Sequence, residues 1–495
     1  MSKLNFFAVL PEAILLAAAC VVLVADLFIP ERRRNLTYSL SLTALAAAAL
    51  CCWMLLDRQV VQYAFGGMFV IDPMAQVLKL FALLATGLAL VYAQSYARAR
   101  AIWRGEFFSL ALFTLLGVMT MISANNLLLI YLGLELQSLA LYALVALQRD
   151  QPRAGEAAMK YFVLGALASG FLLYGMSMLY GATGTLDINE IAHRISASQV
   201  ANRPALVLAS VFLVAGIGFK LGAAPFHMWI PDVYHGAPTP VTLLIASAPK
   251  MAAFAVAFRL LVEGLTPVAG DWHVMLLLLA LASLAVGNVI AVAQSNLKRM
   301  LGYSTIAQMG FMLLAMQSGV AGGNTASAAS AYGAAMFYIV TYALATMVAF
   351  GTMLLVSRQG FEAEQISDLR GLFRQRPWYA FTMALAMFSL AGVPPTVGFY
   401  AKLVVLQALL ADQSAVPVVW IAVVAVLLSL VGAFYYIRVV KVMYFDAPGP
   451  DQSLEAAPDM KIALTVNGVA IIVLGVLPQY LLALCSSAML RTLGG

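Results

Sequence analysis

The chain has 495 residues, of which 63% are hydrophobic and only 10% are charged, and its formal net charge is +6. This composition excludes a water-soluble globular protein, because the chain has too few polar residues to cover its surface, and it indicates a membrane protein with many spans. The excess of positive charge does not require nucleic acid or another anionic partner, because its distribution follows from the membrane topology.

Apolar stretches long enough to cross a bilayer as helices, which takes about 20 residues, recur along the whole chain. The sequence therefore predicts an all-α polytopic membrane protein with about fourteen transmembrane helices and short connections. The predicted spans are 5–29, 37–56, 72–97, 107–123, 126–148, 155–181, 205–234, 240–262, 273–294, 299–318, 328–357, 378–411, 416–443 and 460–490.

Arginine and lysine residues gather in or beside the odd-numbered connections, for example at 32–34, 98–104, 298–299 and 370–376. By the positive-inside rule these connections face the cytoplasm, so both termini are expected on the periplasmic side. The first span is too long for a signal peptide and is followed by arginines, which favours an uncleaved span.

The cysteines and histidines show no metal-ligand pattern. The four cysteines contain no CxxC motif, and the four histidines are scattered along the chain. We therefore expect no metal site, haem or iron–sulfur cluster in this chain.

Three charged residues lie deep inside predicted spans. Glu135 and Lys250 are about nine and ten residues into their spans, or about 14–15 Å at 1.5 Å per residue, which is the centre of a hydrocarbon core about 30 Å thick. Lys220 lies near the middle of the seventh span. A charge at that depth costs about 2.5–3.5 kcal/mol on insertion scales, so each residue is expected to line a polar pathway or to meet a partner. We predict that Glu135 and Lys220 form a variable ion pair; the alternative is a protonated Glu135 hydrogen bonded inside the bundle.

The seventh span is too long for one straight helix, and Gly222 and Pro225 are expected to break it. Proline lacks the backbone N–H and clashes with the preceding turn, so the break should free carbonyl groups near Lys220. His227 follows the break and is either part of the pathway or a core histidine with a hydrogen-bond partner.

The roles of the other charged residues in the predicted spans have more than one interpretation. Lys160 has Glu156 one turn before it, which predicts a surface ion pair or, alternatively, a role in loading protons. Lys79 is either a lysine that reaches to the membrane interface or a pathway residue. Asp72 is read as an interfacial anchor.

Spans 9 to 13 resemble spans 4 to 8, since residues 158–163 are similar to 335–340. Five spans per copy require the copies to be inverted in the membrane, and inverted repeats with broken helices are typical of ion-translocating folds. The predicted division is 1–104 for the first three helices, 105–265 and 266–445 for the two repeats, and 446–495 for the last helix.

The twelfth span supplies the second break. Pro394 and Pro395 interrupt it, and Lys402 follows about ten residues from the far end. Where the fifth span carries Glu135, the tenth offers only Ser304 and Gln308.

Several segments carry a resemblance to a known family. Residues 218–234, 247–250, 297–310 and 391–403, together with 134–135 and 237–242, resemble the antiporter-like subunits of proton-pumping NADH:quinone oxidoreductase, respiratory complex I, and subunit N in particular. The related subunit M carries a glutamate at the position of Lys402, which argues against that subunit.

The resemblance implies a proton-translocating membrane subunit of the bacterial inner membrane, driven by quinone reduction elsewhere in the complex. It implies an input half around Glu135, Lys220 and Lys250, a polar axis at the membrane centre, and an output half around Lys402. The predicted topology leads the half-helix after the second break to the outer face, with Asp412 near its end. The resemblance also implies neighbouring subunit M and small membrane subunits as partners, and places flavin, iron–sulfur clusters and quinone in partner subunits.

Two other functions compete with this reading. A free-standing or Mrp-type monovalent cation/proton antiporter would favour an acid-rich ion site, and acids are scarce at the membrane centre. A structural scaffold without conduction would leave the buried charges unexplained.

Overall fold

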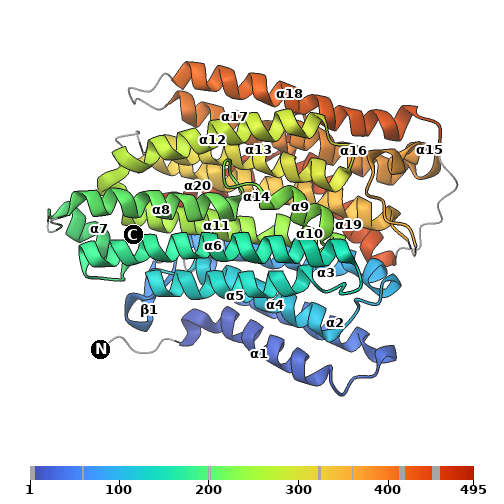
Figure 1. The fold of residues 1–495 in the computed structure, drawn as a ribbon, viewed down its shortest axis with the longest axis horizontal. Coiled ribbons are helices and arrows are strands. Elements are labelled where there is room, and N and C mark those ends of the chain that lie inside the picture. The colour runs from blue at the N-terminus through green and yellow to red at the C-terminus, as the bar shows by residue number, and fades with distance from the viewer. Residues whose placement is uncertain are drawn as a thin grey trace.

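The computed structural model describes residues 6–57, 61–198, 200, 202–320, 325–358, 360–411, 418–448 and 457–494. Within these ranges the chain is a bundle of long helices that run alongside one another (Figure 1). The described ranges contain one small sheet, in which β1 (Gln62–Ala64) pairs antiparallel with β2 (Phe69–Ile71). The all-α architecture predicted from composition is confirmed.

The remaining elements follow in chain order. The first group is η1 (Phe6–Val9), α1 (Leu10–Ala25), η2 (Glu31–Arg33), α2 (Asn35–Asp57), η3 (Phe65–Gly67) and α3 (Pro73–Ala99). The second is α4 (Gly105–Ile122), α5 (Leu127–Val145), α6 (Pro152–Thr183), α7 (Ile188–Ser196), α8 (Arg203–Leu221), α9 (Trp229–Gly236), α10 (Thr239–Ala246), α11 (Ala248–Ala257), η4 (Phe258–Gly264) and η5 (Thr266–Val268). The third is α12 (Ala269–Val292), α13 (Leu297–Ser318), α14 (Thr325–Val356), η6 (Ile366–Leu369), α15 (Leu372–Gln375), α16 (Pro377–Ala391), α17 (Val397–Leu410), α18 (Val418–Phe445), α19 (Pro458–Val476) and α20 (Pro478–Gly494).

The two ends of the bundle are named here by the short helices that lie at them, the α7 end and the α15 end (Figure 1). At the α7 end, Asn126 caps α5 and forms a β-bridge with Asp187, the residue before α7. At the α15 end, Asn296 caps α13 and forms a β-bridge with Gln365, the residue before η6. The helices α5 and α13 therefore cross the bundle in opposite directions.

Among the described residues, twelve helical segments are long and apolar enough to cross a membrane. They match the predicted spans except the tenth and the twelfth. The twelfth is divided into the shorter apolar helices α16 and α17, and the tenth, α13, is not apolar enough. The predicted count of fourteen is therefore not confirmed by length and composition.

The helix α13 can carry polar residues because it lies inside the protein, where nearly all of its side chains are buried. Its neighbours include α12, α14 and α17. The helix α14 is also buried along its membrane-spanning part and runs through the middle of the bundle (Figure 1). A helix that is surrounded by other helices does not contact lipid and can carry polar side chains. A hydropathy threshold therefore does not identify it as a membrane span.

The breaks predicted in the seventh and twelfth spans are confirmed, and they share one local construction. The helix α8 ends before Gly222, at φ +78°, and α16 ends before Gly392, at φ +86°. Glycine adopts this left-handed conformation without the clash that a Cβ atom would cause, so both helices stop there. Each glycine is followed three residues later by a cis-proline, Pro225 or Pro395.

The same sequence interval separates Gly222 from Gly392 and Asn126 from Asn296. Such a constant interval is what the predicted pair of repeats requires. The predicted boundaries at residues 104, 265 and 445 fall at or between helix ends. The division into two inverted repeats stays a prediction.

Candidate functional site

Lys220 lies on the last turn of α8, directly before the break. Its ammonium group donates a hydrogen bond to Ser138 Oγ on α5 at 2.7 Å. Ser138 also donates to the carbonyl of Leu134 at 2.6 Å, which holds its side chain against its own helix. Lys220 is thus tied to α5, the fifth predicted span, through a hydroxyl group.

Glu135 lies three residues before Ser138 on the same face of α5. The described residues show no ion pair between Glu135 and Lys220, and Glu135 Oε1 is buried without a hydrogen-bond partner among them. The two side chains are not paired in this arrangement, and the variable ion pair stays a prediction. One of the three N–H groups of the Lys220 ammonium is directed at Ser138.

Lys250 is buried, with 1% of its surface exposed, near the start of α11. Its ammonium group donates to the backbone carbonyls of Leu221 at 2.9 Å and of Lys220 at 3.2 Å, and lies 4.9 Å from the centre of the Trp229 ring. These carbonyls belong to the last turn of α8. The prediction that the break frees carbonyl groups near Lys220 is confirmed, and Lys250 is the residue that binds them.

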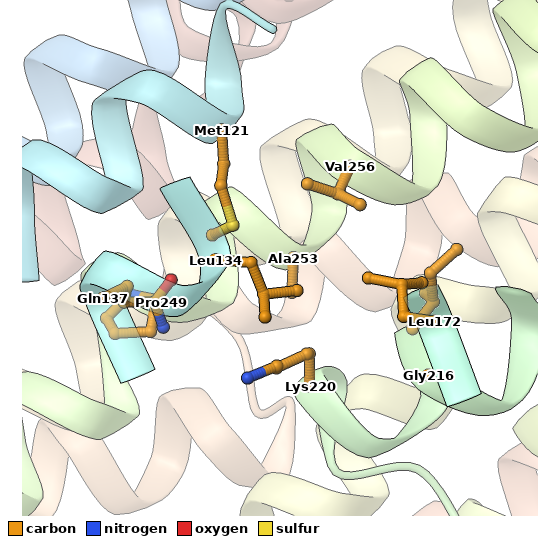
Figure 2. A pocket seen from close by; sticks show the side chains of 10 residues that line it. Met121, Leu134, Gln137, Leu172, Gly216, Lys220, Pro249, Ala253 and Val256 are labelled. Atoms are coloured by element: carbon orange, nitrogen blue, oxygen red, sulfur yellow. The ribbon is translucent and has the colours of Figure 1, made fainter. Parts of the chain in front are cut away.

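A small cavity adjoins Lys220 (Figure 2). Its volume of about 10 Å³ is room for about one water molecule. Gln137 and Pro249 line it beside Lys220, and Met121 and Val256 line its opposite side (Figure 2). Pro249, Ala253 and Val256, which line the cavity together with Lys220, belong to α11.

His227 and Pro225 lie in the segment between α8 and α9, where Pro225 is exposed and His227 is partly buried. The described hydrogen bonds of Lys220 and Lys250 do not include His227. The structure therefore brings together Lys220 and Lys250 at the break and leaves His227 beside them.

Lys402 lies on α17, after the second break. Its ammonium group donates to the carbonyl of Ala391 and to Ser429 Oγ, both at 2.8 Å, and lies 5.1 Å from the centre of the Phe311 ring. Ala391 is the last residue of α16, so Lys402 binds the freed carbonyl of its own break as Lys250 does at the first. The backbone of Pro394 and Pro395 forms the turn between the two helices.

A cavity of about 320 Å³ adjoins Lys402 and is lined by Ser429 and by apolar residues of α17 and α18. Asp412, predicted near the end of this segment, lies outside the described residues.

A cluster of hydroxyl and amide groups occupies the second half of the bundle near its centre. Ser304 is hydrogen bonded to the hydroxyl of Tyr436, and Gln308 Nε2 donates to Tyr436 at 3.0 Å and to the carbonyl of Leu390 at 2.9 Å. Tyr338 donates to Gln308 Oε1. The predicted residues Ser304 and Gln308 are therefore linked through Tyr436, which the sequence did not single out.

Lys160 forms the predicted ion pair with Glu156 at 2.7 Å and a second one with Asp232 at 2.8 Å. Asp232 also binds Arg299 at 2.8 Å. Lys160 is partly exposed, and these partners lie on α6, α9 and α13 rather than among the lysines at the breaks.

Sequence reasoning missed two buried ionic clusters. Lys79 lies 2.6 Å from Glu12 with none of its side chain exposed, so its charge is paired inside the protein. Asp72, expected to be an interfacial anchor, is buried against Arg259 at 2.8 Å. The pairs join distant parts of the chain, and no spacing rule within one helix reveals them.

A third cluster closes the α15 end between the halves of the bundle. Glu362 Oε1 accepts hydrogen bonds from Thr239 Oγ1 at 2.7 Å and from Tyr96 at 2.8 Å, and lies 3.7 Å from Lys298 Nζ. Burial raises the pKa of the Glu362 carboxyl, but the Lys298 charge and these hydroxyl groups together hold that pKa below its usual value.

Among the described residues, no group of three or more histidine, cysteine, aspartate and glutamate side chains could hold a metal ion. The four cysteines form no disulfide. The absence of a redox centre from this chain stays an expectation.

The family model described as "NADH:quinone oxidoreductase/Mrp antiporter, TM" matches residues 124–429, which include both breaks and the three lysines. Two similar curated proteins are the NADH-quinone oxidoreductase subunits N of Herminiimonas arsenicoxydans and of Polaromonas naphthalenivorans. The first is 54% identical and covers 100% of both chains, and the second is 55% identical and covers 99% of this chain and 98% of its own.

Solved structures agree with these matches. A chain of respiratory complex I from Thermus thermophilus is 34% identical, covers 96% of this chain and 98% of its own, and superimposes with a TM-score of 0.79. A chain of the Mrp complex from Dietzia is 19% identical, covers 98% of this chain and 97% of its own, and superimposes with a TM-score of 0.83, which shows a shared fold.

Proposed function

The chain belongs to the subunit N family of NADH:quinone oxidoreductase, and we propose that it moves protons through a relay formed by Glu135, Lys220, Lys250 and Lys402. As a member of this family it is a proton-translocating membrane subunit of the oxidoreductase complex and a multi-pass bacterial membrane protein. The relay, its direction and the role of each residue are the proposal.

One observation supports the relay most strongly. Lys250 binds the backbone carbonyl of Lys220, so two buried lysines lie at the break in α8, deep in the bundle. A charge on one disfavours a charge on the other, because like charges repel strongly where water is scarce. A proton arriving at Lys220 therefore favours release from Lys250, which is the step that a relay needs.

Glu135 would set the charge of Lys220. Glu135 and Ser138 lie on one face of α5, so Lys220 can turn from Ser138, its present partner, to the carboxylate. Two unit charges about 4 Å apart interact by about 4 kcal/mol at an effective dielectric constant of about 20. Movement of the acid toward or away from Lys220 would therefore hold or release the proton.

The tyrosine, serine and glutamine cluster would continue the path toward Lys402. Hydroxyl groups both donate and accept, so the contacts of Ser304 and Gln308 with Tyr436 can pass a proton when water fills the gaps. A second water-sized cavity, lined by Gln308 and Ser389, reaches Ala401, the neighbour of Lys402. Lys402 would then release the proton on the output side.

The orientation in the membrane is proposed from charge. Arg100, Arg153, Lys298 and Arg374 lie in or beside connections at the α15 end, so this end would face the cytoplasm and both termini the periplasm of the inner membrane.

The partner assignments are also proposals. The catalytic activity would be that of a translocase subunit, with flavin, iron–sulfur clusters and quinone in other subunits. The neighbouring antiporter-like subunit M and small membrane subunits would contact this chain.

The shared fold with the Mrp complex supports one alternative, transport of a monovalent cation in exchange for protons. The two functions differ in their ion dependence. Proton uptake by the assembled complex that is unchanged when sodium and potassium are replaced by choline supports the proton relay alone.

The relay is tested by Lys250→Met in the assembled complex, reconstituted into vesicles. We expect proton transport per NADH oxidised to fall strongly while assembly is retained. Lys441→Met is the matched control, because Lys441 is 61% exposed and pairs with Asp446 at the end of α18. Normal transport per NADH in Lys250→Met would show that the proposed relay is wrong.

A further inference from the structure

Arg259 forms a buried ionic cluster at the α7 end of the first half of the bundle. It lies in η4, a π-helical turn that continues α11, and 1% of its surface is exposed. Nη2 donates to Asp72 Oδ1 at 2.9 Å, and Nη1 donates to Glu263 Oε1 at 2.6 Å. Asp72 is the N-cap of α3, so one guanidinium group joins two elements that are far apart in the sequence.

The cluster lies just beyond the cavity that adjoins Lys220. Met121 and Val256 line the side of that cavity opposite Lys220 (Figure 2). Arg259 is one turn beyond Val256, and Nη2 also donates to the carbonyl of Ile122, the residue after Met121, at 3.4 Å. The guanidinium group therefore stands between this cavity and Glu263, whose side chain is 16% exposed.

Arginine has the properties needed to stop protons at this place. Its guanidinium group stays protonated at every physiological pH, so it cannot accept and pass on a proton as lysine can. Its ion pairs with Asp72 and Glu263 balance the charge, so the barrier to protons comes from a permanently protonated group that lies in the path. The two carboxylates offset the cost of burying that charge.

We infer that Arg259, held by Asp72 and Glu263, is an electrostatic seal that separates the Lys220 cavity from the α7 end of the protein. The inference rests on the proposed relay in one respect, since the seal would keep protons on Lys220 and Lys250 from leaving directly and direct them to Lys402. The competing reading is a clamp, in which the cluster only fixes α3 to η4.

Passive proton permeability separates the two readings, because a clamp without a sealing charge would not change it. The assembled complex is reconstituted into vesicles without NADH, a pH gradient is imposed, and its decay is followed with an enclosed pH dye. In Arg259→Gln, which removes the charge, the leak should rise by at least about tenfold, the factor that corresponds to about 1.4 kcal/mol in a barrier. In Asp72→Asn, which keeps the positive charge and loses one ion pair, the leak should stay near the wild-type value.

Lys79→Met is the matched control, because it breaks another buried ion pair, between α3 and Glu12 of α1, that does not adjoin the cavity. Its leak should equal that of the wild type. If Arg259→Gln does not assemble, the double variant Asp72→Asn/Arg259→Gln removes both charges together and leaves no carboxylate opposite a neutral side chain at position 259. The same tenfold increase is expected for it.

Equal leaks in the wild type and in the variants without the Arg259 charge would overturn the seal. Equal increases in Asp72→Asn, Arg259→Gln and Lys79→Met would also overturn it, because general loosening would then explain the leak. Addition of Lys220→Met to Arg259→Gln distinguishes the relay from the seal. A lower leak supports both, and an unchanged leak supports the seal while contradicting passage through Lys220.

Discussion

The ammonium group of Lys250 donates a hydrogen bond to the backbone carbonyl of Lys220 at 3.2 Å, and Lys220 directs its own ammonium group to Ser138 at 2.7 Å. The two lysines thus share the end of one broken helix while their ammonium groups have different partners. Because Lys250 occupies the carbonyls, Lys220 is left to exchange partners on α5. Substitutions of the partners of each lysine can therefore be tested separately.

Ser138→Ala should reduce proton transport only in part. The substitution removes the present partner of Lys220 but leaves Glu135 on the same face of α5. Glu135→Gln should reduce transport more strongly, and the double variant should lose more than the sum of the single losses, because Lys220 would then have neither partner. Transport per NADH in vesicles, normalised to assembled complex, measures all three. Additive losses would mean that the two residues do not share Lys220.

Gly392→Ala should destabilise the second break and displace Lys402. The residue has φ +86°, and an added Cβ would lie 2.8 Å from Lys402 Cδ. A side chain in the left-handed region costs about 1–2 kcal/mol, before any clash is counted. Gly170→Ala is the control, because a Cβ there meets nothing within 4 Å and alanine favours the α6 helix.

The midpoint of thermal unfolding of the complex and transport per complex should both fall in Gly392→Ala. Neither should fall in Gly170→Ala. Wild-type transport in Gly392→Ala would show that the geometry of the break is not needed to position Lys402.

Glu362→Gln should lower stability at neutral pH by about 1–3 kcal/mol, the usual cost of leaving buried partners unpaired. The folded-state pKa of Glu362 lies below its usual value of about 4.3, so the carboxylate contributes its full stabilisation above that value. The contribution is lost as the pH falls through the folded-state pKa. The difference in unfolding midpoint between wild type and variant should therefore be present at pH 7 and shrink below about pH 4. A difference that grows on acidification would contradict this sign.

Depth along the predicted spans was enough to select Lys220, Lys250 and Lys402, because a charge near the membrane centre has few explanations. The two breaks could also be predicted, since glycine followed by proline stops a helix for local reasons. The sequence could not show that Lys250 binds the carbonyls of α8, because that contact depends on how two helices pack.

The role of Arg259, by contrast, could not be predicted from the sequence. It lies close to the end of its predicted span, where an arginine is ordinarily an interfacial residue. Its partner Asp72 is 187 residues away in the sequence. Only the fold shows that η4 and the start of α3 meet in a buried position. The tyrosines around Gln308 were missed for a similar reason, since buried tyrosines are ordinary core residues until a polar partner is found.

Substitutions of Lys402 show whether this residue carries protons or only holds the backbone at the second break. Its contact with the carbonyl of Ala391 fits both roles, so the hydrogen bond alone does not separate them. If Lys402 only braces the break, Lys402→Met and Lys402→Glu should both lower the amount of assembled complex and leave turnover per complex unchanged. If it carries protons, Lys402→Met should lose transport in a complex that still assembles, and Lys402→Glu, which can still be protonated, should keep part of it.

The most direct measurement is therefore proton uptake per NADH oxidised in vesicles containing Lys402→Met complex, normalised to the amount of assembled complex. The relay predicts normal assembly with most of the uptake lost, and partial recovery in Lys402→Glu. Uptake per NADH equal to that of the wild type in the methionine variant would contradict it.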